Sequence, residues 1–177
     1  VAVDTGCLAS GRATCPNLTA LFDYLNVPTA TSDMGFAVSL EGGRIEYSGN
    51  GALRMLGSLR NLSDPSHWRM LRDIVRFFRT AASHAHGLSD QVTLGQFIAD
   101  QGYSPDLVDR HLLPSAGAIW SSPPRQMLDY PARAFLKFFD NHGLLKFVNR
   151  PQWRTVVGGS REYVQRLLSD GRMRVQT

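Results

Sequence analysis

The stretch from Gln152 to Leu168 changes its hydrophobic period part-way along, and this change constrains the fold more than any other feature. Its first residues alternate, as in a strand, up to a Gly158-Gly159 pair, and the later apolar residues recur at helical spacing. The alternating residues are Trp153, Thr155 and Val157, and the helical ones are Tyr163, Val164, Leu167 and Leu168. The stretch therefore predicts a strand, a tight turn and a helix.

The Gly158-Gly159 turn leaves two interpretations open. Glycine accepts positive φ without strain, Ser160 is a typical N-cap residue, and Glu162 puts a negative charge in the first helical turn. In one interpretation the glycines only form the corner. In the other they bring the bare backbone of a helix N-terminus against a phosphate or a flat ring.

Length and composition predict one compact domain over residues 1–177. The chain has 177 residues, of which 43% are hydrophobic, and this is enough for one substantial core. No apolar run approaches the roughly 20 residues that a membrane helix needs. The net charge of +4 allows an anionic partner without requiring one. The first residues, VAVDTG, lack an initiator Met and the features of a signal peptide, so we expect a piece of a longer protein.

The cysteines and histidines predict neither a disulfide framework nor a metal site. Cys7 and Cys15 are the only two cysteines, and their spacing does not match a zinc site. We expect free thiols and a reduced, cytoplasmic setting. His84 and His86 lie in a stretch, Ser83 to Asp90, that we interpret as a loop, and two histidines without further ligands do not form a metal site.

The first half of the chain predicts a helix, a hairpin and a long amphipathic helix. Pro16 suits a first helical residue, and the apolar stripe after it stops near Asn26. Alternating residues on both sides of Glu41-Gly42-Gly43-Arg44 predict a β-hairpin. Asp64-Pro65 then opens the longest helix. Its predicted apolar face is Trp68, Leu71, Ile74, Val75 and Phe78, and its basic edge is Arg69, Arg72, Arg76 and Arg79.

The second half predicts further helices. Thr93 and Gln96 form a capping box for a helix that Gly102 ends, and Ser104-Pro105-Asp106 starts another that runs to Pro114. Ser115 to Ile119 is interpreted as a small-residue connection. A last helix runs from near Pro131 to Asn141-His142-Gly143.

These elements together predict an α+β fold, in which an antiparallel sheet carries a large helical insertion at about residues 64–141. Strands near the two ends of the chain are expected to pair across the insertion.

Asp4-Thr5-Gly6, after an apolar run, is the sharpest short motif. Aspartic proteases present a catalytic carboxylate on such a turn, but their mechanism needs two carboxylates that share a proton. The chain has one Asp-Thr-Gly and a mostly helical pattern, which argues against a protease. Gly-x-Ser-x-Gly, Walker and His-Glu-x-x-His motifs are absent from the sequence.

Longer motifs resemble a known family. The runs are VDTG, PNLTALFDYLNV, SDMGFAVSLEGGRIEYSG, IWSSPPRQMLDYPARAFLKFFDNHGLL and RPQWRTVVGGSREYVQRL. They resemble the middle of the flavin-containing amine oxidase superfamily, and within it the bacterial group of predicted NAD/FAD-binding oxidoreductases. The resemblance spans nearly all of the chain, except that Cys7 to Gly11 and Cys15 depart from the family pattern.

The resemblance implies the substrate or cap region of an FAD enzyme, whose Rossmann domain belongs to the remainder of the polypeptide. The Gly-x-Gly-x-x-Gly fingerprint of that domain is absent from this chain. By the same resemblance, Asp4, Thr5 and Gly6 pass close to the flavin, and Gly158 and Gly159 lead back toward the cofactor domain.

Phe36, Tyr47, Trp120 and Trp153 are the candidate residues for a substrate pocket, although each is also a typical core residue. The flavin performs the redox chemistry in such enzymes, so no catalytic acid or base is predicted. The expected substrate is a small hydrophobic or lipid-like molecule, with no nucleic-acid partner and with peripheral membrane contact left open. The alternative is a non-enzymatic interaction module that uses the basic edge from Arg69 to Arg79 on anionic lipid or nucleic acid.

Overall fold

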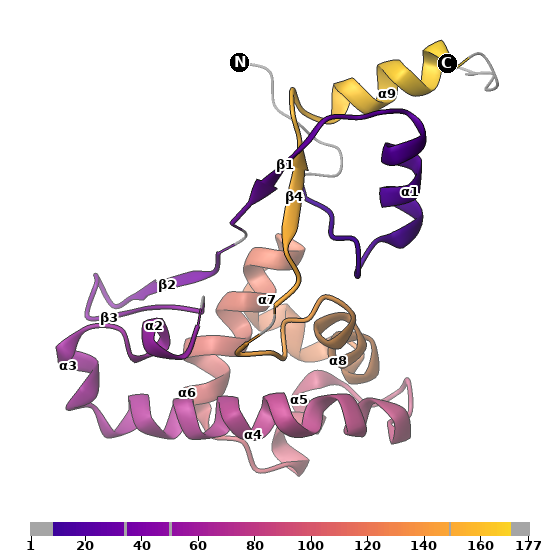
Figure 1. Cartoon of the computed structure of the whole chain (residues 1–177). Coiled ribbons are helices and arrows are strands. Elements are labelled where there is room, and N and C mark those ends of the chain that lie inside the picture. Colours follow the sequence, from indigo (N-terminus) through magenta and orange to yellow (C-terminus); the bar gives the residue numbers. More distant parts are fainter. Residues whose placement is uncertain (1–8, 34, 50, 149, 171–177) are drawn as a thin grey trace. The chain divides into compact units, whose positions relative to one another are not determined.

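The computed structural model describes residues 9–33, 35–49, 51–148 and 150–170 (Figure 1). The described residues belong to two compact units. Unit 1 comprises the described parts of Val1–Met34 and Pro151–Thr177, and unit 2 is Gly35–Arg150, less its undescribed residues. Unit 2 is thus inserted in sequence between the two halves of unit 1. The fold is α+β with a helical insertion, as predicted, but the inserted unit is longer than residues 64–141 because it includes the hairpin.

Unit 1 is built on two strands that are distant in sequence. Its elements are α1 (Pro16–Tyr24), β1 (Thr29–Ser32), β4 (Trp153–Val156) and α9 (Ser160–Ser169). β1 and β4 pair antiparallel, with Thr29 opposite Val156 and Ser32 opposite Trp153. Strands near the two ends therefore do pair across the insertion, as predicted, although β1 itself was not among the predicted strands. Pro16 is the first residue of α1, as expected.

Arg154 fixes the register of this two-stranded sheet. Its Nε donates to Thr29 Oγ1 at 2.9 Å and its guanidinium also donates to the Thr29 carbonyl at 2.7 Å. Its backbone exchanges two hydrogen bonds of 2.8 Å with Ser10. The apolar core of the described part of unit 1 is small and consists of Phe22, Leu25, Val27 and Val156.

Unit 2 begins with the predicted hairpin and two short helices. The elements are β2 (Ala37–Leu40), β3 (Ile45–Ser48), α2 (Ala52–Leu56) and α3 (Leu59–Leu62). β2 and β3 pair antiparallel, and Glu41 and Gly42 in the turn both have positive φ. Within the part of the chain that the structure describes, this hairpin is a sheet separate from β1–β4.

The long helix α4 (Pro65–Gly87) is the main element of unit 2 (Figure 1). Asp64 caps it, since its side chain accepts a hydrogen bond of 2.9 Å from the Ser66 N–H. The predicted apolar face is wrong at Trp68, which is 49% exposed, because the buried stripe runs instead through His67 and Met70. The loop predicted at Ser83 to Asp90 is also wrong as far as Gly87: Ala85 is buried and the His84 ring contacts Phe97, so packing extends the helix.

Six further helices follow α4 among the described residues of unit 2. They are α5 (Leu94–Asp100), α6 (Pro105–Leu107), the π-helical turn η1 (Val108–Leu112), α7 (Leu113–Trp120), the 3₁₀ helix η2 (Pro124–Asp129) and α8 (Ala132–Asn141). Of these, α6 and α8 pack against α4 most closely. The Thr93–Gln96 capping box is confirmed. The connection predicted at Ser115 to Ile119 is wrong, because α7 continues through it with Ser115 and Ala116 buried.

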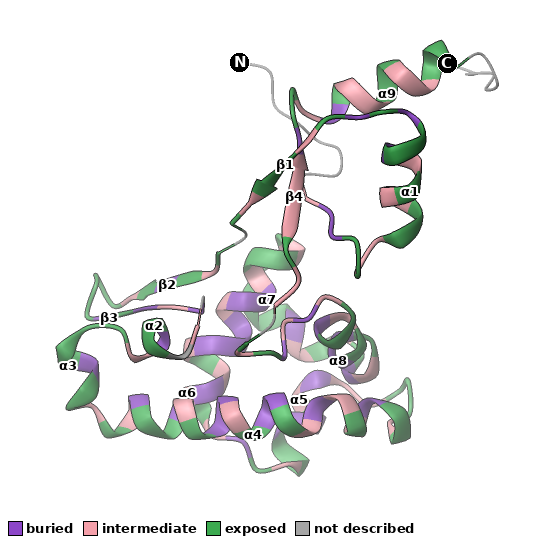
Figure 2. Cartoon of the chain, viewed as in Figure 1, coloured by how far each residue is buried: buried purple, intermediate pink, exposed green. Residues whose placement is uncertain are grey.

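The core of unit 2 is large and aromatic (Figure 2). Phe77, Phe97 and Phe135 are fully buried, and the Phe77 ring contacts those of Tyr103 and Phe139 edge-on at centroid distances of 5.7 and 6.4 Å. Such pairs add to the free energy gained from burying the rings themselves.

Candidate functional site

The predicted strand, turn and helix are present in unit 1 as β4, Gly158-Gly159 and α9. Gly158 has a φ of 87° and Gly159 a φ of 83°, values that L residues rarely adopt. The N-cap is Gly159 and not Ser160, which is instead the first helical residue, so the predicted cap is wrong by one position.

The space around the Gly158-Gly159 turn decides which part of FAD could contact it. A Cβ at Gly158 would lie 2.9 Å from Glu162 Cγ, so the side chain of Glu162 already fills the space that this glycine leaves. Its carboxylate disfavours a phosphate at the same place. The turn does not fit the pyrophosphate of FAD, and only an uncharged part of the cofactor, such as the flavin ring, suits its backbone.

A second site lies in unit 2, where Tyr47 meets His111. The Tyr47 hydroxyl lies 2.5 Å from the carbonyl oxygen of Arg110 and 3.0 Å from His111 Nδ1. The two rings stack at 6.1 Å, and Phe36 meets the His111 ring edge-on at 5.9 Å. We call Phe36, Tyr47 and His111 the Tyr47 cluster. Two of the four predicted pocket residues therefore converge on one imidazole.

The hydrogen bonds assign the protons of this cluster. A carbonyl can only accept, so the Tyr47 hydroxyl donates its one proton to Arg110. His111 Nδ1 must then carry the proton that it donates to the Tyr47 oxygen. Burial, together with the nearby positive charge of Arg150, lowers the pKa of His111 to about 4, and burial raises the pKa of Tyr47. Both groups are neutral at pH 7, and the cluster carries no charge.

Pro114 explains why the Arg110 carbonyl faces Tyr47. In an α-helix that carbonyl would accept from the N–H of residue 114, but proline has none, and its ring crowds the carbonyl four residues earlier. The helix widens into the π-turn η1, with Leu113 N–H bonded to the carbonyl of Val108. π-turns inside helices are frequent at functional sites.

His67, on α4, lies on another side of Tyr47. The two rings meet edge-on at 6.1 Å, and His67 Nε2 lies 3.1 Å from the carbonyl of Met55. Burial lowers the pKa of His67, and its Nδ1 is buried with no hydrogen-bond partner among the described residues. Tyr47 is thus held against two neutral imidazoles.

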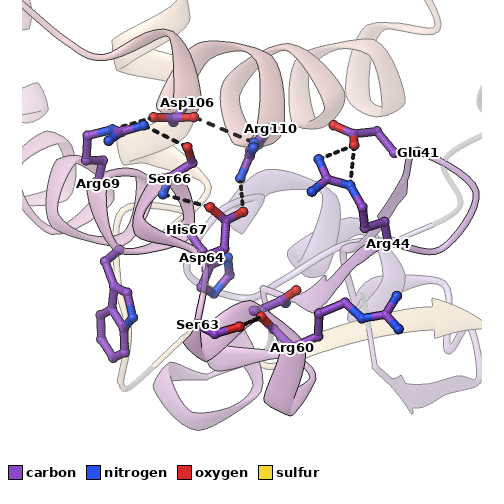
Figure 3. Close-up of polar contacts among 12 residues, drawn as sticks. Glu41, Arg44, Arg60, Ser63, Asp64, Ser66, His67, Arg69, Asp106 and Arg110 are labelled. Carbon is purple, nitrogen blue, oxygen red and sulfur yellow. Dashed lines mark hydrogen bonds and ion pairs between the residues drawn. The ribbon is translucent and has the colours of Figure 1, made fainter.

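Charged groups are kept at the rim of this region, in the network of Figure 3. Arg110 donates to Asp64 at 2.8 Å and lies 3.7 Å from Asp106, which accepts from Arg69 at 2.8 Å. The hydrogen bond from Arg110 holds the pKa of Asp64 below its ordinary value. The network ties η1 to the start of α4 and so fixes the position of His111.

The other predicted site residues lie elsewhere. Trp120 is half-buried and stacks on Phe135 at 5.4 Å in an aromatic group of α7 and α8. Trp153 is half-buried in β4 of unit 1. Asp4, Thr5, Gly6 and Cys7 lie outside the described residues, whereas Cys15 is a free thiol, as predicted.

The Tyr47 cluster does not suit proton transfer. At neutral pH its phenol does not lose a proton and its imidazole does not gain one, because burial opposes both charges. The sequence prediction missed His111, since histidine spacing alone gave no signal. The sequence does contain one signal for this site. Pro114 lies four residues after Arg110, inside an apolar helical pattern, where a proline disrupts the α-helix.

Metal sites and membrane-spanning helices are two further kinds of functional feature. The described residues contain no group of three or more His, Cys, Asp or Glu side chains that could hold a metal ion. None of the helices in the described ranges combines the length and apolarity needed to cross a bilayer.

Comparison with known proteins adds no relative: neither the known family models nor the curated proteins include a match to this chain.

Proposed function

We propose that this chain is the substrate-binding part of an FAD-dependent oxidoreductase of the amine oxidase type, acting on a hydrophobic substrate. The observation that carries the proposal is the convergence of Phe36 and Tyr47 on the neutral His111. The cluster is uncharged and almost completely buried, with Tyr47 5% and His111 4% exposed, and such surroundings favour an apolar neighbour over a charged one. The motifs that resemble the flavin-containing amine oxidases support the same function.

In this proposal the flavin supplies the redox chemistry, and the residues of this chain orient the substrate and exclude water from it. The remainder of the polypeptide holds the adenosine and pyrophosphate of FAD. By the family resemblance, Asp4, Thr5 and Gly6 would lie close to the flavin ring, together with the backbone of Gly158 and Gly159. The reduced state expected of the thiols suggests a cytoplasmic protein.

The test is the flavin content of the full-length natural protein and of three glycine variants. Gly158→Ala and Gly159→Ala should lower the molar ratio of released flavin to protein, because L residues rarely adopt the positive φ of these positions and the substitution distorts the turn. Gly102→Ala is the matched control, since Gly102 has a φ of 60° and no heavy atom within 4 Å of an added Cβ. It should cost about 1 kcal/mol of stability without any loss of flavin.

Each outcome decides a different point. A full-length protein that is colourless and takes up no added FAD contradicts the proposed function. Full flavin occupancy in both turn variants would leave the proposal standing but reduce Gly158 and Gly159 to a corner.

A further inference from the structure

Two short helices of unit 2, α2 and α3, expose leucines to an unusual degree. Leu53 is 83% exposed and Leu59 is 85% exposed. Trp68, one turn into α4, is 49% exposed. Single exposed leucines are common, but three large exposed apolar side chains on three consecutive elements are a candidate interaction surface.

The segment that contains α2 and α3 carries only positive charges. Between Glu46 and Asp64 the chain has no acidic residue, and its charged side chains are Arg54 and Arg60. Neither arginine forms an ion pair with a described residue, and Figure 3 draws the Arg60 guanidinium without a bond to any side chain shown. Both cations are therefore available to an anionic partner.

The basic edge of α4, which the sequence suggested for this role, is different. Arg69 binds Asp106, and Arg76 binds the Gly102 carbonyl at 3.1 Å and lies 4.2 Å from the centre of the Tyr103 ring. Arg72 donates to the buried Asp73 at 3.2 Å. These three of the four arginines contact other residues of unit 2, so their charge is partly neutralised although the side chains are exposed.

An open groove of about 480 Å³ lies at the junction of α3 and α4. Leu62, Pro65 and Trp68 line it together with Arg69 and Arg72. The Trp68 indole N–H donates to the Leu62 carbonyl at 2.8 Å, so its polar edge is satisfied and its ring can meet apolar matter.

We propose that the α2–α3 surface, defined by Leu53, Arg54, Leu59, Arg60 and Trp68, docks on the surface of an anionic lipid bilayer. Leucines that protrude between arginines, with a tryptophan beside them, are typical of segments that lie in the bilayer interface. The unpaired arginines are complementary to anionic headgroups. A fluid surface accepts separate protruding side chains, whereas a protein partner would need a matched pocket for each. This inference does not depend on the redox function.

The experiment is vesicle co-sedimentation of the intact protein. Binding is expected on vesicles that contain phosphatidylserine, and it should weaken as salt is raised, because salt screens the arginines. The Leu53→Glu/Leu59→Glu double variant should lower the partition coefficient at least about tenfold, since it removes the inserting side chains and adds negative charge. Leu168→Glu is the matched control: Leu168 is 51% exposed on α9 in unit 1, and its variant should bind as the wild type does.

A charge variant keeps the test decisive if the double Glu variant folds poorly by thermal unfolding. Arg54→Gln/Arg60→Gln should weaken binding to anionic vesicles about 30-fold at low salt, with no effect on neutral vesicles. Wild-type protein that ignores anionic vesicles overturns the proposal. A concentration-dependent dimer that the double Glu variant abolishes, or DNA binding that depends on the arginines but not on the leucines, also overturns it.

Discussion

The two units differ in how they are stabilised. Unit 2 has a large aromatic core in which Phe77, Phe97 and Phe135 are fully buried. The described core of unit 1 consists of Phe22, Leu25, Val27 and Val156, with Tyr163 and other half-buried residues against it. Because burial of apolar area is the main favourable contribution to folding, unit 2 has by far the larger share.

Polar contacts carry more of the organisation in unit 1. Arg154 holds Thr29, and Arg166 on α9 donates to the carbonyl of Asn26 at 2.8 Å after α1. Hydrogen bonds of this kind contribute about 1 kcal/mol each, which specifies an arrangement more than it stabilises one. We therefore expect unit 2 to be stable by itself, because its large core supplies most of the burial. Unit 1 should gain more stability than unit 2 from any further contact, such as a cofactor or the rest of the polypeptide.

The largest expected effect comes from truncating one phenylalanine in each core. Phe77→Ala should lower the free energy of unfolding of unit 2 by about 3–5 kcal/mol, because it leaves a cavity among Phe78, Tyr103 and Phe139. Phe22→Ala should leave the main transition unchanged, since it weakens only unit 1. Urea unfolding followed by circular dichroism, which mainly reports the helices of unit 2, measures both.

An equal shift of that unfolding transition by both variants would contradict the view that the two units are stabilised separately. It would mean that the two units unfold as one cooperative domain, which is the organisation predicted from the sequence.

The next largest effect is a dependence of the unfolding free energy of unit 2 on pH. All five histidines lie in this unit, within residues 35–150. The folded-state pKa of His111 is about 4, below its ordinary value of 6.5. Between these values the unfolded chain binds the proton and the folded one does not, so stability is complete above pH 6.5 and falls as the pH drops toward 4. The loss amounts to about 3 kcal/mol, to which His67 adds in the same direction.

His111→Gln isolates this contribution. Glutamine keeps a donor for the Tyr47 oxygen but does not titrate, so the drop in unfolding free energy between pH 6.5 and 4 should shrink by about 3 kcal/mol. Chemical denaturation at several pH values measures it. An unchanged pH dependence would show that His111 is not held neutral by burial.

Local signals in the sequence predicted much of the fold. Pro16, the Thr93–Gln96 capping box and the hairpin around Gly42 each act within a few residues, and all three are found where expected. β1 was not predicted, because Thr29–Ser32 has no apolar alternation of its own. Its pairing is set by β4, more than 100 residues later in the chain.

The candidate site was predicted only in part, for a similar reason. Phe36 and Tyr47 could be chosen as aromatic residues of a hairpin, but their common partner His111 comes from a π-turn that Pro114 induces. Trp68 was assigned to the buried face because of its size. The helical phase set by Met70 and Phe77 turns it outward instead.

The most direct test of the proposed function is hydrogen–deuterium exchange on the full-length protein, with and without its flavin. We predict that flavin slows exchange in unit 1 at the backbone amides of residues 156–162, around the Gly158-Gly159 turn, by about tenfold or more. Exchange in α4 of unit 2, over Pro65–Gly87, should stay the same. Identical exchange in both forms at residues 156–162 would remove the turn from the flavin contacts, and a full-length protein that binds no flavin would contradict the assignment of this chain to an FAD enzyme.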